Sequence, residues 1–82
     1  MDETESKKIK IRLNNIDKVK KFANVASTFE SDIDVIADRA VIDGKSILGL
    51  FSLDLTQDMY VRIVTDDINE RRKFEYEMEE FK

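Results

Sequence analysis

Apolar and polar residues alternate along the chain with two different periods, and each period predicts a different kind of element. Between residues 8 and 13 an apolar residue occupies every second position, with lysine or arginine between, which predicts a half-buried strand. After Asn15, a good N-cap, apolar residues recur at helical spacing as far as about Thr28. The stripe that this helix would bury consists of Ile16, Val19, Phe22, Ala23 and Ala26.

The strand pattern returns three times further along the chain. Residues 33–37 and 40–42 predict two strands joined by a tight turn at Asp38 and Arg39. Residues 59–65 alternate again and predict a fourth strand. The central pair therefore forms a hairpin, while the first and last strands each need a longer connection.

Two more helices are predicted, one central and one C-terminal. The central helix extends from about Ser46 to Leu53, and the polar residues 56–58 form a loop behind it. Asp67 and Glu70 resemble a capping box at the start of the C-terminal helix, which would continue to its last apolar residue. Its sparse apolar stripe consists of Ile68, Phe74, Met78 and Phe81.

The element order β-α-β-β-α-β-α predicts an α+β fold. Because half-buried strands need a cover, we expect a two-layer, open-faced β-sandwich, in which a four-stranded, mainly antiparallel sheet carries three helices on one face. The 82 residues contain no repeat, linker or low-complexity tract, so the sequence predicts a single domain over residues 1–82. Its polar first six residues are expected to be frayed.

The stretch GKSILGLFSLDL, residues 44–55, holds both glycines of the chain. Gly44 suits a turn because glycine adopts positive φ without a Cβ clash. Ser46 suits the N-cap of the central helix, since its hydroxyl can accept a free backbone N–H from the first turn. The glycine and the serine together predict a chain reversal that leads directly into a helix.

The central helix carries apolar residues on two faces. Leu50 and Leu53 share one face, and Ile47, Leu48 and Phe51 form the other. If a short helix buries only the first face, the second is an exposed patch suited to docking of a protein. The alternative, which periodicity alone slightly favours, is that both faces belong to the core or that Leu48 is an isolated exposed leucine.

Composition excludes several kinds of chemistry. The chain contains no cysteine or histidine, which excludes disulfides, thiol chemistry and ordinary zinc or haem sites, so we expect no metal and no cofactor. No apolar run reaches membrane-spanning length, and no signal-peptide centre is present, so we expect a cytoplasmic protein without a membrane partner. The net charge of −4 argues against nucleic acid as a partner.

The segment GKSILGLFSLDL resembles the KSIMGVMSL region of HPr proteins, the small phosphocarriers of the bacterial sugar phosphotransferase system. The preceding segment ANVASTFESDIDV resembles the second half of that family's first helix and its second strand. Without gaps from residue 15 to 65, the two family landmarks fall at Asn15 and Ser46. The resemblance covers nearly the whole chain and implies the same element order and two-layer fold.

The resemblance also implies a loss of chemistry at the first helix. In HPr proteins a histidine at the helix start accepts phosphate from enzyme I, a phosphoenolpyruvate-dependent kinase, and an arginine stabilises the phosphate. Asn15 takes the place of the histidine and Asp17 that of the arginine. An amide nitrogen is not a nucleophile, and a carboxylate about 5 Å from a phosphate costs roughly 3 kcal/mol at an effective dielectric constant of about 20. We therefore predict no catalytic residue. Ordinary helix capping by itself explains both residues fully.

Three lysines in the same helix are further candidates for contact with a partner. Lys18, Lys20 and Lys21 lie close enough in sequence to hold an acidic protein or a phosphate. A helical lysine cluster is more often a solvated face, and we favour that alternative.

Ser46 is the family landmark that remains. In Gram-positive relatives an ATP-dependent kinase phosphorylates the serine of this motif, which implies regulatory phosphorylation of Ser46 here. A phosphate there would meet free N–H groups and would add negative charge beside Ile47, Leu48 and Phe51, which would alter any docking there. A role as N-cap alone explains the serine about equally well. Gly44 and Asp43 depart from the family motif and count against recognition by the kinase.

These observations favour a non-catalytic, HPr-like protein that works by binding other proteins. The resemblance implies a regulatory role in carbon catabolite repression, with a serine kinase/phosphorylase and a transcriptional regulator as partners. An alternative is a structural or assembly module, a monomer or weak dimer that associates through Ile47, Leu48 and Phe51. An ordinary phosphohistidine carrier is the least favoured, because the histidine is missing.

Overall fold

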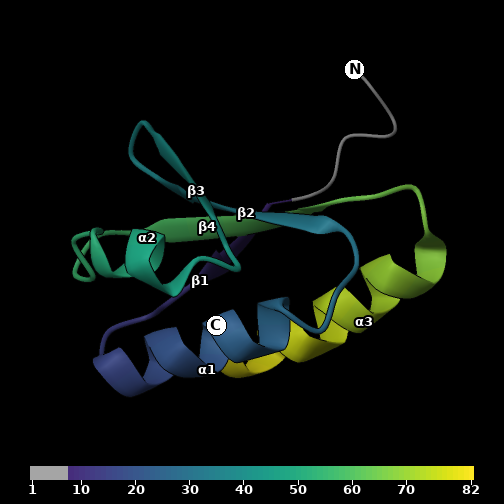
Figure 1. Cartoon of the computed structure of the whole chain (residues 1–82), viewed down its shortest axis with the longest axis horizontal. Coiled ribbons are helices and arrows are strands. Elements are labelled where there is room, and N and C mark those ends of the chain that lie inside the picture. The colour runs from purple at the N-terminus through teal and green to yellow at the C-terminus, as the bar shows by residue number, and fades with distance from the viewer. Residues whose placement is uncertain (1–7) are drawn as a thin grey trace.

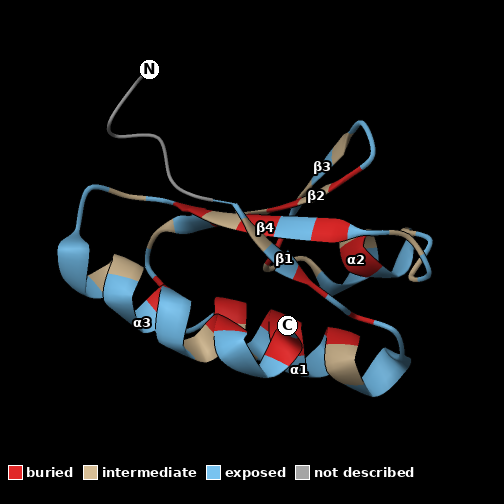
Figure 2. Cartoon of the chain, turned by 180° about the vertical axis from the view of Figure 1, so that it is seen from behind, coloured by how far each residue is buried: buried red, intermediate tan, exposed pale blue. Residues whose placement is uncertain are grey.

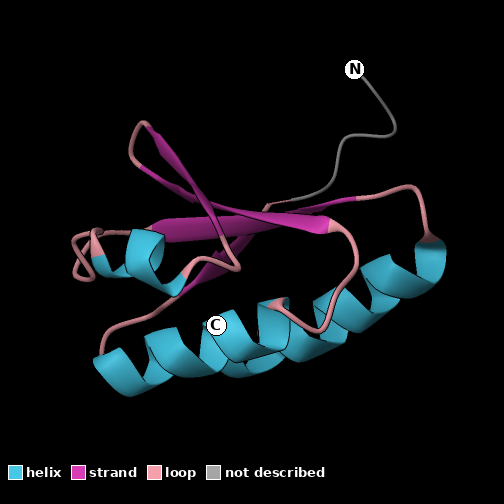
Figure 3. Cartoon of the chain, viewed as in Figure 1, coloured by secondary structure: helices cyan, strands magenta, loops and turns pink. Residues whose placement is uncertain are grey.

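The computed structural model describes residues 8–82, so the predicted fraying of residues 1–6 lies outside the described residues. The elements follow the predicted order (Figures 1 and 3). They are β1 (Ile9–Ile11), α1 (Ile16–Ala26), β2 (Asp32–Ala37), β3 (Ala40–Asp43), α2 (Ile47–Phe51), β4 (Met59–Val64), α3 (Ile68–Met78) and the 3-10 turn η1 (Glu79–Phe81).

The four strands form one antiparallel sheet in the order β1-β4-β2-β3. The helices α1 and α3 lie side by side and cover one face of the sheet, while α2 lies at one end of it (Figure 1). Among residues 8–82, no helix covers the opposite face of the sheet (Figure 1). The two-layer, open-faced α+β fold predicted from the sequence is therefore confirmed.

The core fills the space between the sheet and the pair of long helices. Alternate residues of β2 and β4 point into it, and the buried sides of α1 and α3 face the sheet (Figure 2). Edge-to-face contacts between aromatic rings join elements that are far apart in sequence. The ring centroids of Phe22 and Phe81 are 5.4 Å apart, and those of Phe29 and Phe74 are 5.9 Å apart. Within residues 8–82 no polar or charged residue is buried, so the core is apolar throughout.

Two residues that the sequence placed in buried stripes are exposed. Ile16 is 57% exposed and Ile68 is 60% exposed, so both assignments were wrong. Each is the first residue of its helix. Because Cβ atoms tilt toward the helix N-terminus, the side chain of a first residue points beyond the end of the packed layer.

The predicted reason for Gly44 was also wrong. Within the described chain no glycine has positive φ, and the residue that does is Asp38, at 54° in the β2–β3 turn. Gly44 is instead needed for close approach. Its N–H donates to the carbonyl oxygen of Ile33 (2.7 Å), and an added Cβ would lie only 2.9 Å from Ile33 Cγ2. Glycine thus lets the chain just after β3 lie close beside Ile33 of β2.

Element boundaries differ from prediction at both ends of the chain. β1 ends at Ile11, because the N–H of Arg12 donates to the carbonyl oxygen of Phe81 (2.6 Å) rather than continuing the sheet. α3 ends at Met78 and tightens into η1, which carries Phe81 into the core. The C-terminal turn therefore supplies the backbone hydrogen-bond acceptor for the residue that follows β1. Within residues 8–82 no helix has the length and apolar character needed to cross a bilayer.

Candidate functional site

Asn15 caps the first helix. Its backbone is extended (φ −152°, ψ 167°), and its side-chain oxygen accepts the N–H of Lys18 at 2.8 Å. Asp17 follows in the first turn, where its carboxylate complements the helix dipole. Both side chains are exposed. The start of α1 is thus stabilised by its own amide cap, which confirms the predicted N-cap.

The surroundings of Asn15 are balanced in charge. Asn15, Asp17, Lys18 and Lys21 line a small hollow together with Glu80 and Phe81 from the C-terminal turn. The ammonium of Lys21 forms a salt bridge of 2.8 Å with Glu80. Two carboxylates therefore offset the two lysines in this hollow. An anion placed here would meet no net positive charge, which is a poor setting for a phosphoryl group.

The lysine cluster of α1 is divided between two sides of the helix. Lys18 and Lys21 share the hollow at the helix start, where Lys18 is half-buried. Lys20 is exposed and does not line it. The structure therefore does not bring Lys18, Lys20 and Lys21 together into one basic site.

Ser46 caps the start of α2 in the same manner. Its backbone is extended (φ −98°, ψ 102°), and its hydroxyl oxygen accepts the N–H of Gly49 at 3.2 Å. The N–H of Ser46 donates to the backbone carbonyl of Asp43 (3.0 Å). The carboxylate of Asp43 accepts the N–H of Lys45 (2.9 Å), so it is fixed close to the serine. The predicted N-cap at Ser46 is confirmed.

Sequence reasoning missed two residues that hold α2 in place. The ammonium of Lys45 donates to the carbonyl oxygen of Phe29 (2.7 Å) and ties the start of α2 to the end of the α1 region. At Gly49 an added Cβ would lie 2.9 Å from Ile42 Cγ2, so this glycine lets α2 approach β3. Glycine inside a helix lowers its stability by about 1 kcal/mol relative to alanine. A glycine within a predicted helix therefore suggests a packing role, and this signal was available in the sequence.

The two faces of α2 have different surroundings. Leu50 is fully buried, and Leu53, just beyond the helix, packs against the core. On the other face Ile47 is 37% exposed, Leu48 79% and Phe51 41%. The interpretation that both faces belong to the core was therefore wrong. These three residues, here called the α2 patch, form an apolar surface that no described residue covers.

The starts of α1 and α2 lie at the same end of the molecule. Figures 1 and 2, which view it from opposite sides, both place α2 beside the N-terminal end of α1, and the two helices are in contact. The elements that carry Asn15 and Ser46 thus share one surface with the α2 patch. Within residues 8–82 no group of side chains is arranged to hold a metal ion.

An open-faced sandwich with two capped helix starts at one end defines the class of protein, an HPr-like fold. A model of the HPr component of the phosphotransferase system, described as its phosphorylation site, matches residues 16–79. The match covers most of the chain, so the chain belongs to the HPr family of the phosphotransferase system. Proteins of this family are phosphocarriers that interact with other proteins of that system.

Solved structures agree with this assignment. An HPr-C-His protein from Thermoanaerobacter tengcongensis is similar at 25% identity and a TM-score of 0.69, over 89% of this chain and 91% of that one. A phosphocarrier protein HPr from Bacillus anthracis str. Ames has the same fold, at 20% identity and a TM-score of 0.69, over 95% of this chain and 96% of that one. No curated protein sequence matches the chain at a significant level.

Proposed function

We propose that this HPr-family protein does not carry phosphate on a side chain of α1, and that it acts by binding other proteins under the control of Ser46. One observation supports this more than any other. The helices α1 and α2, which start at the same end of the molecule, are both capped, but only the cap of α2 is a hydroxyl. A hydroxyl can be phosphorylated, and an amide cannot serve as a phosphate carrier.

The start of α1 supports the first half of the proposal. The amide oxygen of Asn15 is occupied by the N–H of Lys18, and the 82 residues contain no histidine that could replace it. Asp17 and Glu80 add negative charge where a phosphoryl group would sit. At a separation of about 5 Å and an effective dielectric constant of about 20, the interaction energy of two opposite unit charges differs from that of two like charges by several kcal/mol.

The start of α2 supports the second half. Ser46 directly precedes the α2 patch and is partly exposed. A phosphate on its hydroxyl would bring about −2 charge next to Leu48, which is 79% exposed. The same phosphate could accept N–H groups of the first turn, replacing the bond from Gly49. Phosphorylation would thus change which partner the patch accepts without unfolding the helix.

Asp43 is the feature that weakens this switch. Its carboxylate is held near Ser46 by the N–H of Lys45, so a phosphate on Ser46 would be repelled by it. We expect Asp43→Asn to raise the rate at which a serine kinase modifies Ser46, because it removes that charge and retains an acceptor for Lys45. This substitution separates charge repulsion from loss of the turn.

The experiment is incubation with an HPr serine kinase and ATP, followed by mapping of phosphate by mass spectrometry. We expect labelling of Ser46, loss of label in Ser46→Ala, and full label in the matched control Ser52→Ala, which removes an exposed hydroxyl at the other end of α2. Absence of label on Ser46 in wild type would remove the switch. A parallel incubation with phosphoenolpyruvate and enzyme I should give no acid-labile phosphate.

The exposure of the α2 patch favours a second function, assembly through that patch. Two copies could bury Ile47, Leu48 and Phe51 against each other, or the patch could fit a fixed structural partner. Sedimentation of wild type against Leu48→Asp distinguishes this from regulation. An assembly role requires that the substitution lower the mass observed, and equal monomer masses would eliminate self-assembly through the patch.

A further inference from the structure

The outer edge of the sheet at β1 carries a concentration of positive charge. β1 is the first strand in the order β1-β4-β2-β3, so only one of its two sides is paired. A shallow hollow along this strand is lined by Lys8, Lys10, Arg12 and Lys82, together with half-buried Ile9. Among residues 8–82, no carboxylate lines this hollow. The overall charge of the chain is −4, so the edge differs in sign from the molecule as a whole.

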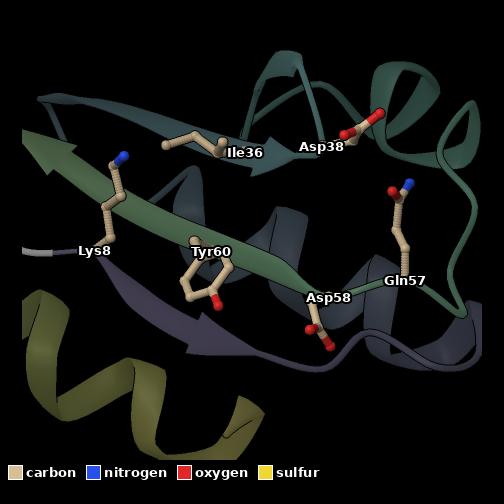
Figure 4. A pocket seen from close by; sticks show the side chains of 6 residues that line it. All are labelled: Lys8, Ile36, Asp38, Gln57, Asp58 and Tyr60. Atoms are coloured by element: carbon tan, nitrogen blue, oxygen red, sulfur yellow. The ribbon is translucent and has the colours of Figure 1, made fainter.

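Part of this positive charge has no partner. Lys10 lies 3.6 Å from Asp58, and Lys82 lies 2.7 Å from Glu79, and all four of these side chains are solvent-exposed. The other two cations of the hollow form no ion pair within residues 8–82. Figure 4 shows Lys8 at the start of β1 and Asp58 near the other end of the strand. Two positive charges therefore remain at this edge after both carboxylates are counted.

The backbone of β1 also offers hydrogen-bonding groups on the unpaired side. The N–H of Gly44 donates to the carbonyl oxygen of Ile33, so odd-numbered residues of β2 bond to β3 and even-numbered ones to β4. The register between β2 and β4 then directs the odd-numbered residues of β4 to β1. It follows that Ile9 and Ile11 bond to β4, whereas Lys10 points its N–H and C=O away from the sheet.

Arg12 marks one end of this free edge. Its N–H points the same way as that of Lys10 and is taken by the carbonyl oxygen of Phe81 at 2.6 Å. Within residues 8–82, the outward backbone groups of Lys8 and Lys10 have no such partner. An extended chain can therefore lie beside these two residues and form about four backbone hydrogen bonds with them.

The charges decide which kind of chain this edge accepts. Lysines on an edge strand repel a second edge of the same kind, so pairing with another copy is disfavoured. In an antiparallel, hydrogen-bonded pair the two side chains lie on the same face, close enough for opposite charges to attract. An acidic residue opposite Lys10, and another opposite Lys8, would meet this condition. The residue between them would lie opposite Ile9, where an apolar side chain fits.

We propose that the free edge of β1 binds an extended, acidic segment of another protein as an added antiparallel strand. Addition of a strand to an exposed sheet edge combines affinity from the backbone with selectivity from alternate side chains. Outward N–H and C=O groups at strand spacing suit a peptide better than a nucleic acid. The site includes neither Ser46 nor the α2 patch, so it does not depend on the proposed function.

The expected binding is weak and sensitive to salt, because the edge is short and its charges are exposed. We expect a dissociation constant of roughly 0.1 mM at low ionic strength, rising about tenfold at about 0.5 M salt. Asp2, Glu3 and Glu5 precede the strand in the sequence and lower the positive potential at this edge. Neutralising them together (Asp2→Asn, Glu3→Gln, Glu5→Gln) should therefore tighten binding by a few fold.

The decisive test is titration with a short peptide of alternating glutamate and valine, blocked at both ends, followed by NMR. Binding should shift the amide signals of residues 8–12 and slow hydrogen exchange at Lys10. In the added strand the N–H groups of the glutamates face β1 and those of the valines face away. N-methylation of the glutamates should therefore abolish binding, and N-methylation of the valines should change it less than about twofold. A matched peptide with glutamine in place of glutamate should bind about tenfold more weakly.

Variants of the protein test the same site from the other side. Lys8→Glu should weaken binding of the glutamate peptide about fivefold, because one attractive pair becomes repulsive. Lys20→Glu is the matched control: Lys20 is exposed on α1, away from the hollow, and the change in net charge is the same. It should change binding less than about twofold. Lys8→Glu with Lys10→Glu should instead bind a peptide of alternating lysine and valine, which wild type does not.

Three results would overturn the proposal. Equal binding of the peptide methylated at its glutamates would mean that charge alone is recognised, without an added strand. Tighter binding of a single-stranded oligonucleotide of similar charge would mean that the edge is a nucleic-acid surface. Shifts confined to the starts of α1 and α2 would place the peptide at the other end of the molecule.

Discussion

The helices α1 and α2 start at the same end of the molecule and are capped alike, yet they differ in anchoring and in chemistry. Each begins at a residue with extended backbone whose side-chain oxygen accepts the N–H three residues later. Asn15 does this for a helix of eleven residues with four buried side chains, and Ser46 for one of five residues with one. The longer helix is held by its buried face. The shorter one is held by neighbouring contacts from Lys45 and Gly49.

The two helices therefore differ in how firmly they are packed and in whether their cap residue carries a group that can be modified. Helix α1 combines a well-packed body with an exposed amide at its start, and an amide is not a nucleophile that can carry phosphate. The start of α2 combines little packing of its own with a hydroxyl and an apolar patch. On the proposed function, a chain with a hydroxyl at the second start and no nucleophile at the first is suited to being bound, and the predictions that follow test each half of that contrast.

The largest expected effect comes from introducing at the start of α1 the histidine and the arginine that the resemblance to HPr proteins implies for these positions. Asn15→His with Asp17→Arg should give acid-labile phosphate with phosphoenolpyruvate and enzyme I, where wild type gives none. The imidazole supplies the nucleophile, and the guanidinium replaces a repulsive charge by an attractive one. The measurement is transfer of radiolabelled phosphate to the protein.

Asn15→Gln with Asp17→Arg is the matched control for this experiment. It carries the same favourable charge without an imidazole and should remain unlabelled. Label on the control, or equal label on wild type, would show that phosphate is accepted at another residue and that the start of α1 is not decisive.

The two faces of α2 should differ by several kcal/mol in their contribution to stability. Leu50 is fully buried, so Leu50→Ala should lower the free energy of unfolding by about 2 to 5 kcal/mol through lost burial and a cavity. Leu48 is 79% exposed, so Leu48→Ala should change it by less than about 0.5 kcal/mol. Urea unfolding followed by circular dichroism measures both. Similar losses for the two variants would mean that the patch is covered in solution.

Removal of the two N-cap side chains should change the free energy of unfolding by smaller amounts, and the loss should be larger for the cap of α1. Removal of an N-cap side chain costs about 1 kcal/mol in a typical helix. Asn15→Ala loses a bond of 2.8 Å at the head of a packed helix, and we expect that full cost. Ser46→Ala loses a longer bond of 3.2 Å in a five-residue helix, and we expect roughly half of it. A greater loss for Ser46→Ala would show that the serine is retained for capping rather than for modification.

Most of the fold could be predicted because local patterns and long-range packing agree. The alternation in β4 and the helical stripe of α1 each name the residues that are buried, apart from Ile16. Both helix caps were predictable for the same reason, since Asn15 and Ser46 satisfy backbone donors within their own turns. Such features depend only on neighbours in sequence.

The remaining features depend on contacts between distant segments. The need for glycine at position 44 arises from Ile33, and the anchoring of Lys45 from a carbonyl of Phe29. Neither partner can be identified from spacing along the chain. The exposed face of α2 was undecided for a related reason, because periodicity shows that a helix has two apolar faces but not which of them meets the core. The candidate site was therefore predictable in its caps and not in its surroundings.

The smallest expected effect concerns the polar loop that follows α2. The side-chain hydroxyl of Thr56 donates to Asp54 at 2.6 Å and its N–H at 3.0 Å, and these bonds lower the pKa of that carboxyl below its ordinary value. A lowered pKa in the folded state means that the ionised carboxylate stabilises the loop. That contribution is complete above the pKa of the unfolded chain and is lost as the pH falls through the folded-state pKa.

Thr56→Val should therefore raise the pKa of Asp54 toward its ordinary value without restoring it fully, because the backbone N–H still donates. The part of the stability difference that comes from ionised Asp54 should be small at neutral pH and should be lost as the pH falls through the folded-state pKa of this carboxyl. Titration of the Asp54 carboxyl carbon by NMR measures the shift directly. Ser52→Ala is the matched control, since its hydroxyl donates to the carbonyl oxygen of Gly49 and not to Asp54. An unchanged Asp54 titration in Thr56→Val would show that the hydroxyl of Thr56 does not contribute to the lowered pKa of this carboxyl.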